Sequence, residues 1–202
     1  MPKIGVLALQ GAFVEHIRML ERLGAKAVEI RKPGDFTPDL DGVIFPGGES
    51  TAMNRLLREL DMLEPIREAL LRGMPALGTC AGLILMAKRF TDSGWQHFQV
   101  LDVTVCRHGF GRQLGSFRTE GEFAGIGRLP MVFIRGPYVT ETGAGVDVLA
   151  TVKDRIVAVR QGNLLGVAFH PELTEDTRLH AYFLRMVDKD NMYPVCPGDS
   201  TV

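Results

Sequence analysis

The chain has 202 residues, of which 46% are hydrophobic and 23% are charged, and its formal net charge is -1. This composition supports a large buried core and excludes disorder, while the near-neutral charge excludes a surface built for nucleic acids or acidic membranes. No apolar run approaches the roughly 18 residues that span a bilayer, and the first residues lack a signal-peptide pattern, so we expect a cytoplasmic protein. The three cysteines lack C-x-x-C spacing, which predicts neither a disulfide framework nor a structural zinc site.

The first half of the chain alternates strand-like apolar runs with helical periodicity. Strands are expected at residues 4–9, 27–30, 42–45 and 75–80, and helices at 13–24, 50–60 and 63–72. Ser50 or Thr51 is expected to cap the second of these helices. This alternation predicts an α/β fold with a parallel sheet and helices on both faces.

The second half contains short β runs that Gly and Pro interrupt. We expect antiparallel strands that extend the same sheet at residues 99–105, 131–134, 146–152 and 156–159. Another apolar run, at 164–169, precedes an amphipathic helix that carries Leu179 and Phe183. Residues 1–188 are therefore expected to form one domain, followed by a flexible tail at 189–202.

Cys80 stands in the segment Gly78-Thr79-Cys80-Ala81-Gly82, between a predicted strand and a predicted helix. We expect the two glycines to permit backbone angles that a Cβ would penalise, so that the cysteine is lifted out of the sheet on a sharp turn. At a helix N-terminus, backbone N–H groups stabilise a thiolate. The alternative is a buried structural cysteine.

His170, Pro171 and Glu172 follow the apolar run at 164–169. Proline favours an extended conformation before it, and residues two apart in an extended segment share a face. The Glu172 carboxylate could then orient His170 as a base toward a thiol. The alternative is a surface or capping histidine.

Paired glycines follow the strand expected at 42–45, in the segment Pro46-Gly47-Gly48-Glu49-Ser50-Thr51. Free N–H groups at such a turn suit an oxyanion, although an ordinary strand-to-helix turn is the alternative. All three segments follow the carboxyl ends of predicted strands, where ligands bind in open α/β sheets. Together they predict a Cys-His-Glu triad for acyl transfer.

With these motifs, and with 5-GVLALQGA-12, 110-FGRQ-113 and 170-HPELTED-176, the chain resembles class I (triad-type) glutamine amidotransferases over residues 3–188. Within that superfamily it resembles the glutaminase subunits of pyridoxal 5′-phosphate synthases. The resemblance implies a three-layer, flavodoxin-like fold with a mixed, mostly parallel sheet. It also implies hydrolysis of L-glutamine to L-glutamate and ammonia, without a cofactor or a metal.

The resemblance assigns the catalytic roles to Cys80, His170 and Glu172. It implies that the Cys80 thiolate attacks the side-chain amide carbon of glutamine while His170 transfers protons, and that a γ-glutamyl thioester then forms on Cys80. The backbone N–H groups of Gly47 and Ala81 are expected to stabilise the oxyanion of the tetrahedral intermediate. Matching positions imply substrate contacts at Gly48, Glu49, Ser50, Arg107, Ile134 and Arg135. The guanidinium of Arg107 or Arg135 can bind the α-carboxylate of glutamine bidentately. The alternative is that both are solvated arginines at strand ends. The chain departs from the family pattern beside Arg107, where His108-Gly109 replaces an Asn-Ser pair.

The resemblance also implies a partner, a (β/α)8-barrel synthase that receives the ammonia through a channel and carries up to twelve glutaminase subunits on a dodecameric core. Docking is expected to raise activity by reordering the turn near Gly47. Gln10, Gly11, Glu15 and His16 follow the first strand and are the expected interface.

Other readings stay open. They are a glutaminase for another synthase, such as imidazole glycerol phosphate synthase, a cysteine hydrolase of similar architecture, and a non-catalytic binding module. Cys106 and Cys196 are expected to have no catalytic role. Three histidines are expected on the surface: His97, His108 and His180.

Overall fold

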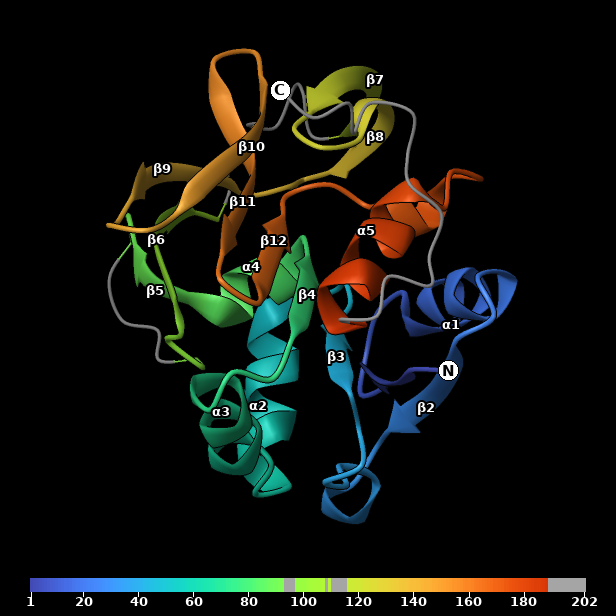
Figure 1. Ribbon diagram of the computed structural model, residues 1–202. Helices are drawn as coiled ribbons and strands as arrows, with labels where there is room; N and C mark the ends of the chain where they lie inside the picture. The colour runs from blue at the N-terminus through green and yellow to red at the C-terminus, as the bar shows by residue number, and fades with distance from the viewer. Residues whose placement is uncertain (93–96, 108, 110–115, 189–202) are drawn as a thin grey trace.

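The computed structural model describes residues 1–92, 97–107, 109 and 116–188 (Figure 1). Its central sheet orders the strands as β2 (Lys26–Ile30), β1 (Lys3–Leu7), β3 (Gly42–Phe45), β4 (Ala76–Thr79), β12 (Leu164–Val167), β11 (Arg155–Gln161), β9 (Tyr138–Thr142), β6 (Leu101–Cys106) and β5 (Ala87–Phe90), with β10 (Asp147–Val152) paired to β11. The helices are α1 (Phe13–Arg22), α2 (Ser50–Glu59), α3 (Leu63–Leu71), α4 (Ala81–Met86) and α5 (Arg178–Val187).

The sheet is mixed and mostly parallel in its functional half. Strands β2, β1, β3, β4 and β12 pair in parallel, whereas β11 is antiparallel to both β12 and β9. Figure 1 shows α1 and α5 on one side of the central strands and α2, α3 and α4 on the other. The predicted fold class, α/β with helices on both faces of a mostly parallel sheet, is confirmed.

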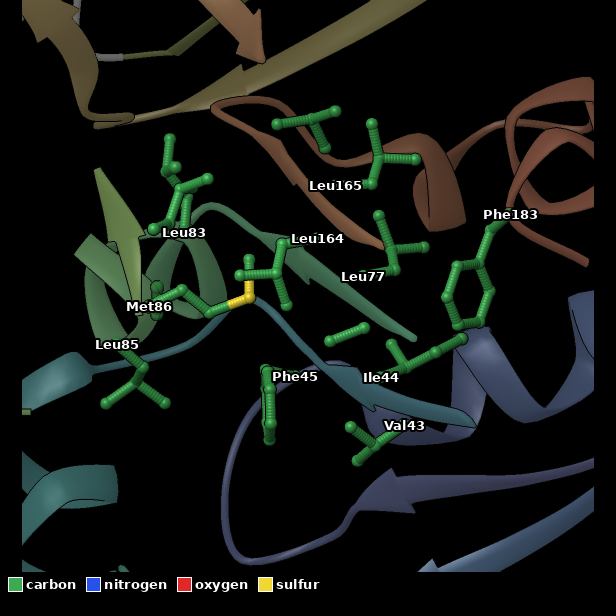
Figure 2. Close-up of a cluster of buried hydrophobic side chains, with 14 of the residues drawn as sticks. Val43, Ile44, Phe45, Leu77, Leu83, Leu85, Met86, Leu164, Leu165 and Phe183 are labelled. Atoms are coloured by element: carbon green, nitrogen blue, oxygen red, sulfur yellow. The ribbon is translucent and has the colours of Figure 1, made fainter. Parts of the chain in front are cut away.

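The central strands are apolar along their whole length because helices cover both faces of the sheet. Every residue of β3 and of β12 is buried. Figure 2 shows Met86 of α4 and Phe183 of α5 on opposite sides of this strand layer. This packing fixes the carboxyl ends of β3, β4 and β12 relative to the helices. It therefore also fixes the positions of the loops that follow these strands.

One strand prediction was wrong. Residues 131–134 do not extend the central sheet but lie in β8 (Gly127–Ile134), which forms a separate hairpin with β7 (Ser116–Phe123). Phe133 of the hairpin meets Phe169, just after β12, edge-on, and this contact packs the hairpin against the end of β12. Within the hairpin, Phe133 stacks on Phe117. The hairpin backbone also accepts a hydrogen bond at Val132 from the N–H of His170, at 2.8 Å. The hairpin therefore supports the segment that carries His170.

The part of the chain that the structure describes contains no helix long and apolar enough to cross a membrane. The tail predicted at 189–202 lies outside the described residues.

The glycines beside Cys80 serve a different purpose from the one predicted. Neither Gly78 nor Gly82 has a positive φ. A Cβ on Gly82 would overlap the carbonyl oxygen of Phe45, and a Cβ on Gly78 would overlap the backbone of Gly82. The absent side chains thus let α4 lie directly against the ends of β3 and β4.

Replacing Gly82 with alanine should destabilise the fold, because the added methyl group meets backbone atoms that have no room to move. We expect the free energy of unfolding to fall by about 1–3 kcal/mol, the usual cost of overpacking a core. Chemical denaturation monitored by circular dichroism measures the change. Gly34→Ala is the matched control, since a Cβ there meets open space, and it should change stability by less than about 0.5 kcal/mol. Equal stability of the two variants would contradict the packing argument.

Candidate active site

Three loops meet at one edge of the sheet because β3, β4 and β12 are neighbours that run in parallel. The last paired residues place Phe45 beside Gly78, and Thr79 beside Val167. The glycine turn, Cys80 and the His170 segment therefore emerge side by side. The structure brings together the residues that sequence reasoning selected, although Gly47 and His170 are 123 positions apart.

Cys80 occupies the sharp turn between β4 and α4, with φ +49° and ψ −99°. A non-glycine residue in this region is strained, as is usual for a nucleophile on a strand-to-helix elbow. The turn is held at both ends: the Cys80 N–H donates to the Val167 carbonyl at 2.8 Å, and its carbonyl accepts from the Ile84 N–H at 3.3 Å. The side chain is largely buried, with 7% of the residue exposed.

His170 lies between the Cys80 sulfur and the Glu172 carboxylate. Its Nδ1 is 2.7 Å from Oε1 of Glu172, and both residues are buried. Burial opposes protonation of the imidazole, but hydrogen bonds to Cys80 and Glu172 and their negative charges outweigh it and raise the pKa of His170 to about 10. The arrangement favours the protonated form of His170.

The backbone of this segment differs from the prediction. Pro171 begins a 3-10 turn, η2 (Pro171–Leu173), so His170 and Glu172 are not two positions of one extended strand. Proline suits the first position of such a turn because it lacks an N–H and its φ is fixed. The turn curls the carboxylate back onto Nδ1 of His170.

The glycine turn is attached to the segment that follows β1. The Gly47 carbonyl accepts from the Ala12 N–H at 2.9 Å, and the Gln10 side-chain oxygen accepts from the Glu49 N–H at 2.7 Å. Gly47 also packs against His170 so closely that a Cβ would overlap the imidazole ring. The ring of His170 therefore requires glycine at position 47.

The N-cap of α2 is Glu49, so the prediction that Ser50 or Thr51 caps this helix was wrong. The carboxylate of Glu49 accepts hydrogen bonds from the N–H groups of Thr51 at 2.9 Å and Ala52 at 2.7 Å. Burial works against ionisation, but these hydrogen bonds and the nearby Arg107 lower the pKa of Glu49 below its usual value. Glu49 thus places a negative charge at the rim of the site.

A cleft of about 620 Å³ opens beside the cysteine. It is lined by Gly48, Glu49, Ser50, Thr51, Cys80, Ile84, Arg107, Ile134, Arg135 and Pro137. Six of the eight positions expected to bind substrate therefore face one cavity, with Ile134 and Arg135 exposed at the end of β8, whereas Gly47 and Ala81 are not among its lining residues. A hollow of about 720 Å³ between the β7–β8 hairpin and residues 173–178 contains none of these groups.

Arg107 is held by a partner that sequence reasoning missed. Its Nε lies 3.0 Å from Oδ2 of Asp92, and Nη2 also donates to that oxygen. Asp92 precedes a stretch without clear periodicity, so no sequence pattern pointed to it. The carboxylate fixes the guanidinium at the cleft wall.

The expected interface residues have different surroundings. Gly11 is exposed, and Gln10 and Glu15 are half-buried, but the His16 side chain is fully buried and offers no surface to a partner. His16 is buried because it lies on the same face of α1 as the buried residues Met19 and Leu20.

Two of the three histidines expected on the surface are buried. His97 is 2% exposed and His180 is fully enclosed in α5. Cys106 is half-buried on β6, while His108 and Cys196 lie outside the described residues. Within the described ranges, no group of three or more His, Cys, Asp or Glu side chains is placed to hold a metal ion.

The model of the SNO glutamine amidotransferase family matches residues 6–189. The chain belongs to this family. It is 55% identical to the pyridoxal 5′-phosphate synthase subunit PdxT of Streptococcus pneumoniae (strain ATCC 700669 / Spain 23F-1) over 187 residues, which cover 91% of this chain and 97% of that protein.

Solved structures agree with this assignment. A crystal structure of a glutamine amidotransferase, 46% identical, superposes with a TM-score of 0.87 and covers 91% of this chain and 98% of its own. The structure of PurLQS from Thermotoga maritima is 17% identical, with a TM-score of 0.69, and covers 93% of this chain and 99% of its own. The second likeness concerns the fold alone.

Removing the sulfur beside His170 should lower the pKa of its imidazole. In Cys80→Ala the pKa should fall from about 10, because burial then opposes protonation with only Glu172 to offset it. NMR titration of the histidine ring nitrogens measures the shift. Cys106→Ala, which changes a thiol on β6, is the control and should leave the titration unchanged. An unaltered pKa in Cys80→Ala would contradict the proposed contact.

The same shift makes the fold sensitive to alkaline pH. The folded pKa of His170 lies above the value of about 6.5 for a free imidazole, so binding of this proton stabilises the native state fully below that pH. The contribution is lost as the pH rises through about 10. Denaturation at a series of pH values should show this loss in the wild type and a smaller one in Cys80→Ala.

Proposed function

We propose that this chain hydrolyses L-glutamine to L-glutamate and ammonia and supplies the ammonia to a synthase that makes pyridoxal 5′-phosphate. The observation that carries the proposal is the imidazole of His170 placed between a strained elbow cysteine and a buried carboxylate. A Cys-His-Glu triad of this form suits acyl transfer. Membership of the glutamine amidotransferase family and the 55% identity to a PdxT subunit support the substrate and the pathway.

The first half-reaction forms a thioester. The Cys80 sulfur attacks the side-chain amide carbon of glutamine, and the C=O π electrons move onto oxygen to give a tetrahedral oxyanion. N–H groups of Gly47 and Ala81 are the proposed donors to this oxygen. His170 gives its proton to the amide nitrogen, the C=O bond re-forms and the C–N bond breaks. Ammonia departs, and a γ-glutamyl thioester remains on Cys80.

The second half-reaction hydrolyses that thioester. Neutral His170 takes a proton from water as the water oxygen attacks the acyl carbon, and the C–S bond breaks to release glutamate and the thiolate. Glu172 holds Nδ1 throughout, so that Nε2 exchanges the protons. Its carboxylate also stabilises the imidazolium that begins the first half-reaction and forms again in the second.

The cleft supplies charges that complement an amino acid. Arg107 and Arg135 are the proposed contacts for the α-carboxylate, since both line the cleft that contains Cys80. The ionised carboxylate of Glu49 on the same wall is placed to attract the α-ammonium group. Gly48, Ser50 and Ile134 complete the proposed substrate contacts.

The proposed partner is a (β/α)8-barrel synthase subunit, in a complex of up to twelve copies of each chain, which receives the ammonia without loss to water. Exposed Gly11 and half-buried Gln10 and Glu15 are the proposed docking contacts. Gln10 and the adjoining Ala12 hydrogen-bond to the glycine turn. Contact with this segment would therefore reach the oxyanion donors, which explains how docking could raise activity.

Cys80→Ala should abolish glutamine hydrolysis while the fold and the binding of the synthase persist, because the nucleophile is lost and only a small buried side chain changes. Released glutamate and ammonia measure the activity. In the wild type, a diazoketone analogue of glutamine should alkylate Cys80, which mass spectrometry of its peptide detects. Hydrolysis by Cys80→Ala at the wild-type rate would refute the mechanism.

Reconstitution tests the partner. Ammonia transfer is expected with a pentose-phosphate-using pyridoxal 5′-phosphate synthase and not with the cyclase of imidazole glycerol phosphate synthase. Transfer to the second partner alone would assign the chain to the other pathway.

Arg107→Lys should raise the KM for glutamine about tenfold with little change in kcat, because an ammonium group cannot bind a carboxylate bidentately. Steady-state kinetics of the synthase complex measure both constants. Arg118→Lys, an exposed arginine of β7 outside the cleft, is the matched control. Equal KM values for the two variants would remove Arg107 from the substrate site.

A further inference from the structure

Behind the catalytic carboxylate lies a buried cluster that the reaction scheme does not use. It consists of His16 of α1, Thr79 of β4 and His180 of α5, and it adjoins Glu172 of η2. Nδ1 of His16 is 2.9 Å from Nε2 of His180, and Nε2 of His16 is 3.1 Å from Oγ1 of Thr79. The same Nε2 lies 3.5 Å from Oε2 of Glu172, with both side chains fully buried.

The two oxygens of the Glu172 carboxylate have different surroundings. Oε1 is hydrogen-bonded to His170. Oε2 is buried and has no hydrogen bond to any residue in the described part of the chain, and it faces Nε2 of His16. Burying a carboxylate oxygen without a nearby donor costs free energy of folding. The position of the proton on His16 therefore decides whether the charge on Oε2 is stabilised.

The hydrogen-bond pattern selects one tautomer. Nδ1 of His180 is buried without a partner among the described residues. An orphaned buried N–H is rarer than an orphaned acceptor, so His180 carries its proton on Nε2 and donates it to Nδ1 of His16. His16 must then carry its own proton on Nε2, where it points toward Thr79 and Glu172.

The electrostatics agree with two neutral rings. Burial, and then the charges of His180 and His170, hold the pKa of His16 well below its usual value. Burial lowers the pKa of His180 to about 3. The groups that face His16 are His180 on α5, Thr79 on β4 and Glu172 on η2, with His170 acting through space. A neutral donor supports the carboxylate without competing with His170 for its charge.

We propose that His16 is a positioning residue of the triad, whose Nε2–H, fixed by His180, stabilises the charge on the second oxygen of Glu172 across 3.5 Å and so keeps the first oxygen on His170. This role rests on the proposed glutaminase mechanism. It gives His16 a task inside the catalytic network and not at the partner interface. Loss of the donor would free the carboxylate to turn and would weaken the imidazolium that it stabilises.

Steady-state kinetics of the full chain in complex with the synthase test this role. In His16→Leu we expect kcat for glutamine hydrolysis to fall about tenfold with KM unchanged, because an apolar side chain then faces the buried Oε2 of Glu172 in place of a polar N–H. The alkaline limb of the pH profile of kcat/KM should move about one unit lower, because His170 loses its proton more easily. His16→Gln, whose amide N–H reaches the position of Nε2, should restore both toward wild type.

Met19→Ala is the matched control, since Met19 is buried on the same helix but is one turn away from the cluster. It should lower stability without moving the pH limb. The proposal is overturned if His16→Leu keeps the wild-type profile, if Met19→Ala reproduces the shift, or if His16→Gln behaves as His16→Leu does.

A measurement on the unsubstituted chain covers the case in which His16→Leu fails to fold. The ¹⁵N shifts of the ring of His16 should report a neutral Nε2–H tautomer at neutral pH, whereas an Nδ1–H tautomer or an imidazolium would overturn the proposal. Cys80→Ala separates the two hypotheses. Hydrolysis by that variant would refute the proposed function, while the tautomer of His16 is tested independently of it.

Discussion

An imidazole buried in a protein core is ordinarily neutral, because its charged form is poorly solvated there. His170 is buried, yet its contacts with Cys80 and Glu172 raise its pKa to about 10. The structure around it keeps the ring between these two groups. The β7–β8 hairpin holds its backbone through Val132, and Gly47 leaves space for the ring. The proposed nucleophile, proton donor and oxyanion turn all depend on that placement.

The placement in turn depends on the order of the strands. The segments of the candidate site follow β3, β4 and β12, which are adjacent in the sheet although β12 lies about 85 residues after β4. Their apolar runs and the rule that ligands bind at the carboxyl ends of parallel strands were sufficient to predict this convergence. The sequence pattern could not predict that β8 leaves the sheet, because an apolar β run looks the same in a central sheet and in a covering hairpin.

The errors at single residues have physical reasons. Gly78 and Gly82 were expected to relieve backbone strain, but the strain lies at Cys80 itself, and the glycines only permit close packing. Motif spacing reveals that a glycine is needed but not which clash requires it. The capping role of Glu49 was missed because Ser50 and Thr51 are also good caps and stand beside it.

The buried histidines illustrate what periodicity could have supplied. His16 shares a helical face with Met19 and Leu20, and His180 shares one with Phe183 and Leu184. Spacing of three and four residues from apolar positions indicates burial, whereas residue type alone suggested the surface. Their mutual contact could not be predicted, since it joins helices 164 positions apart.

Residues 10–16, which comprise the end of the β1–α1 connection and the start of α1, touch the site at two places. Gln10 and Ala12 bind the glycine turn, and His16 faces the far side of the Glu172 carboxylate. A displacement of this segment would change the geometry of the proposed oxyanion donors and the surroundings of the Glu172 carboxylate together. Gly11 in the same segment is exposed, so a partner that docks there, as proposed, would act on both parts of the site through one short piece of backbone. Binding energy at the surface could in this way set both the stability of the oxyanion and the basicity of His170.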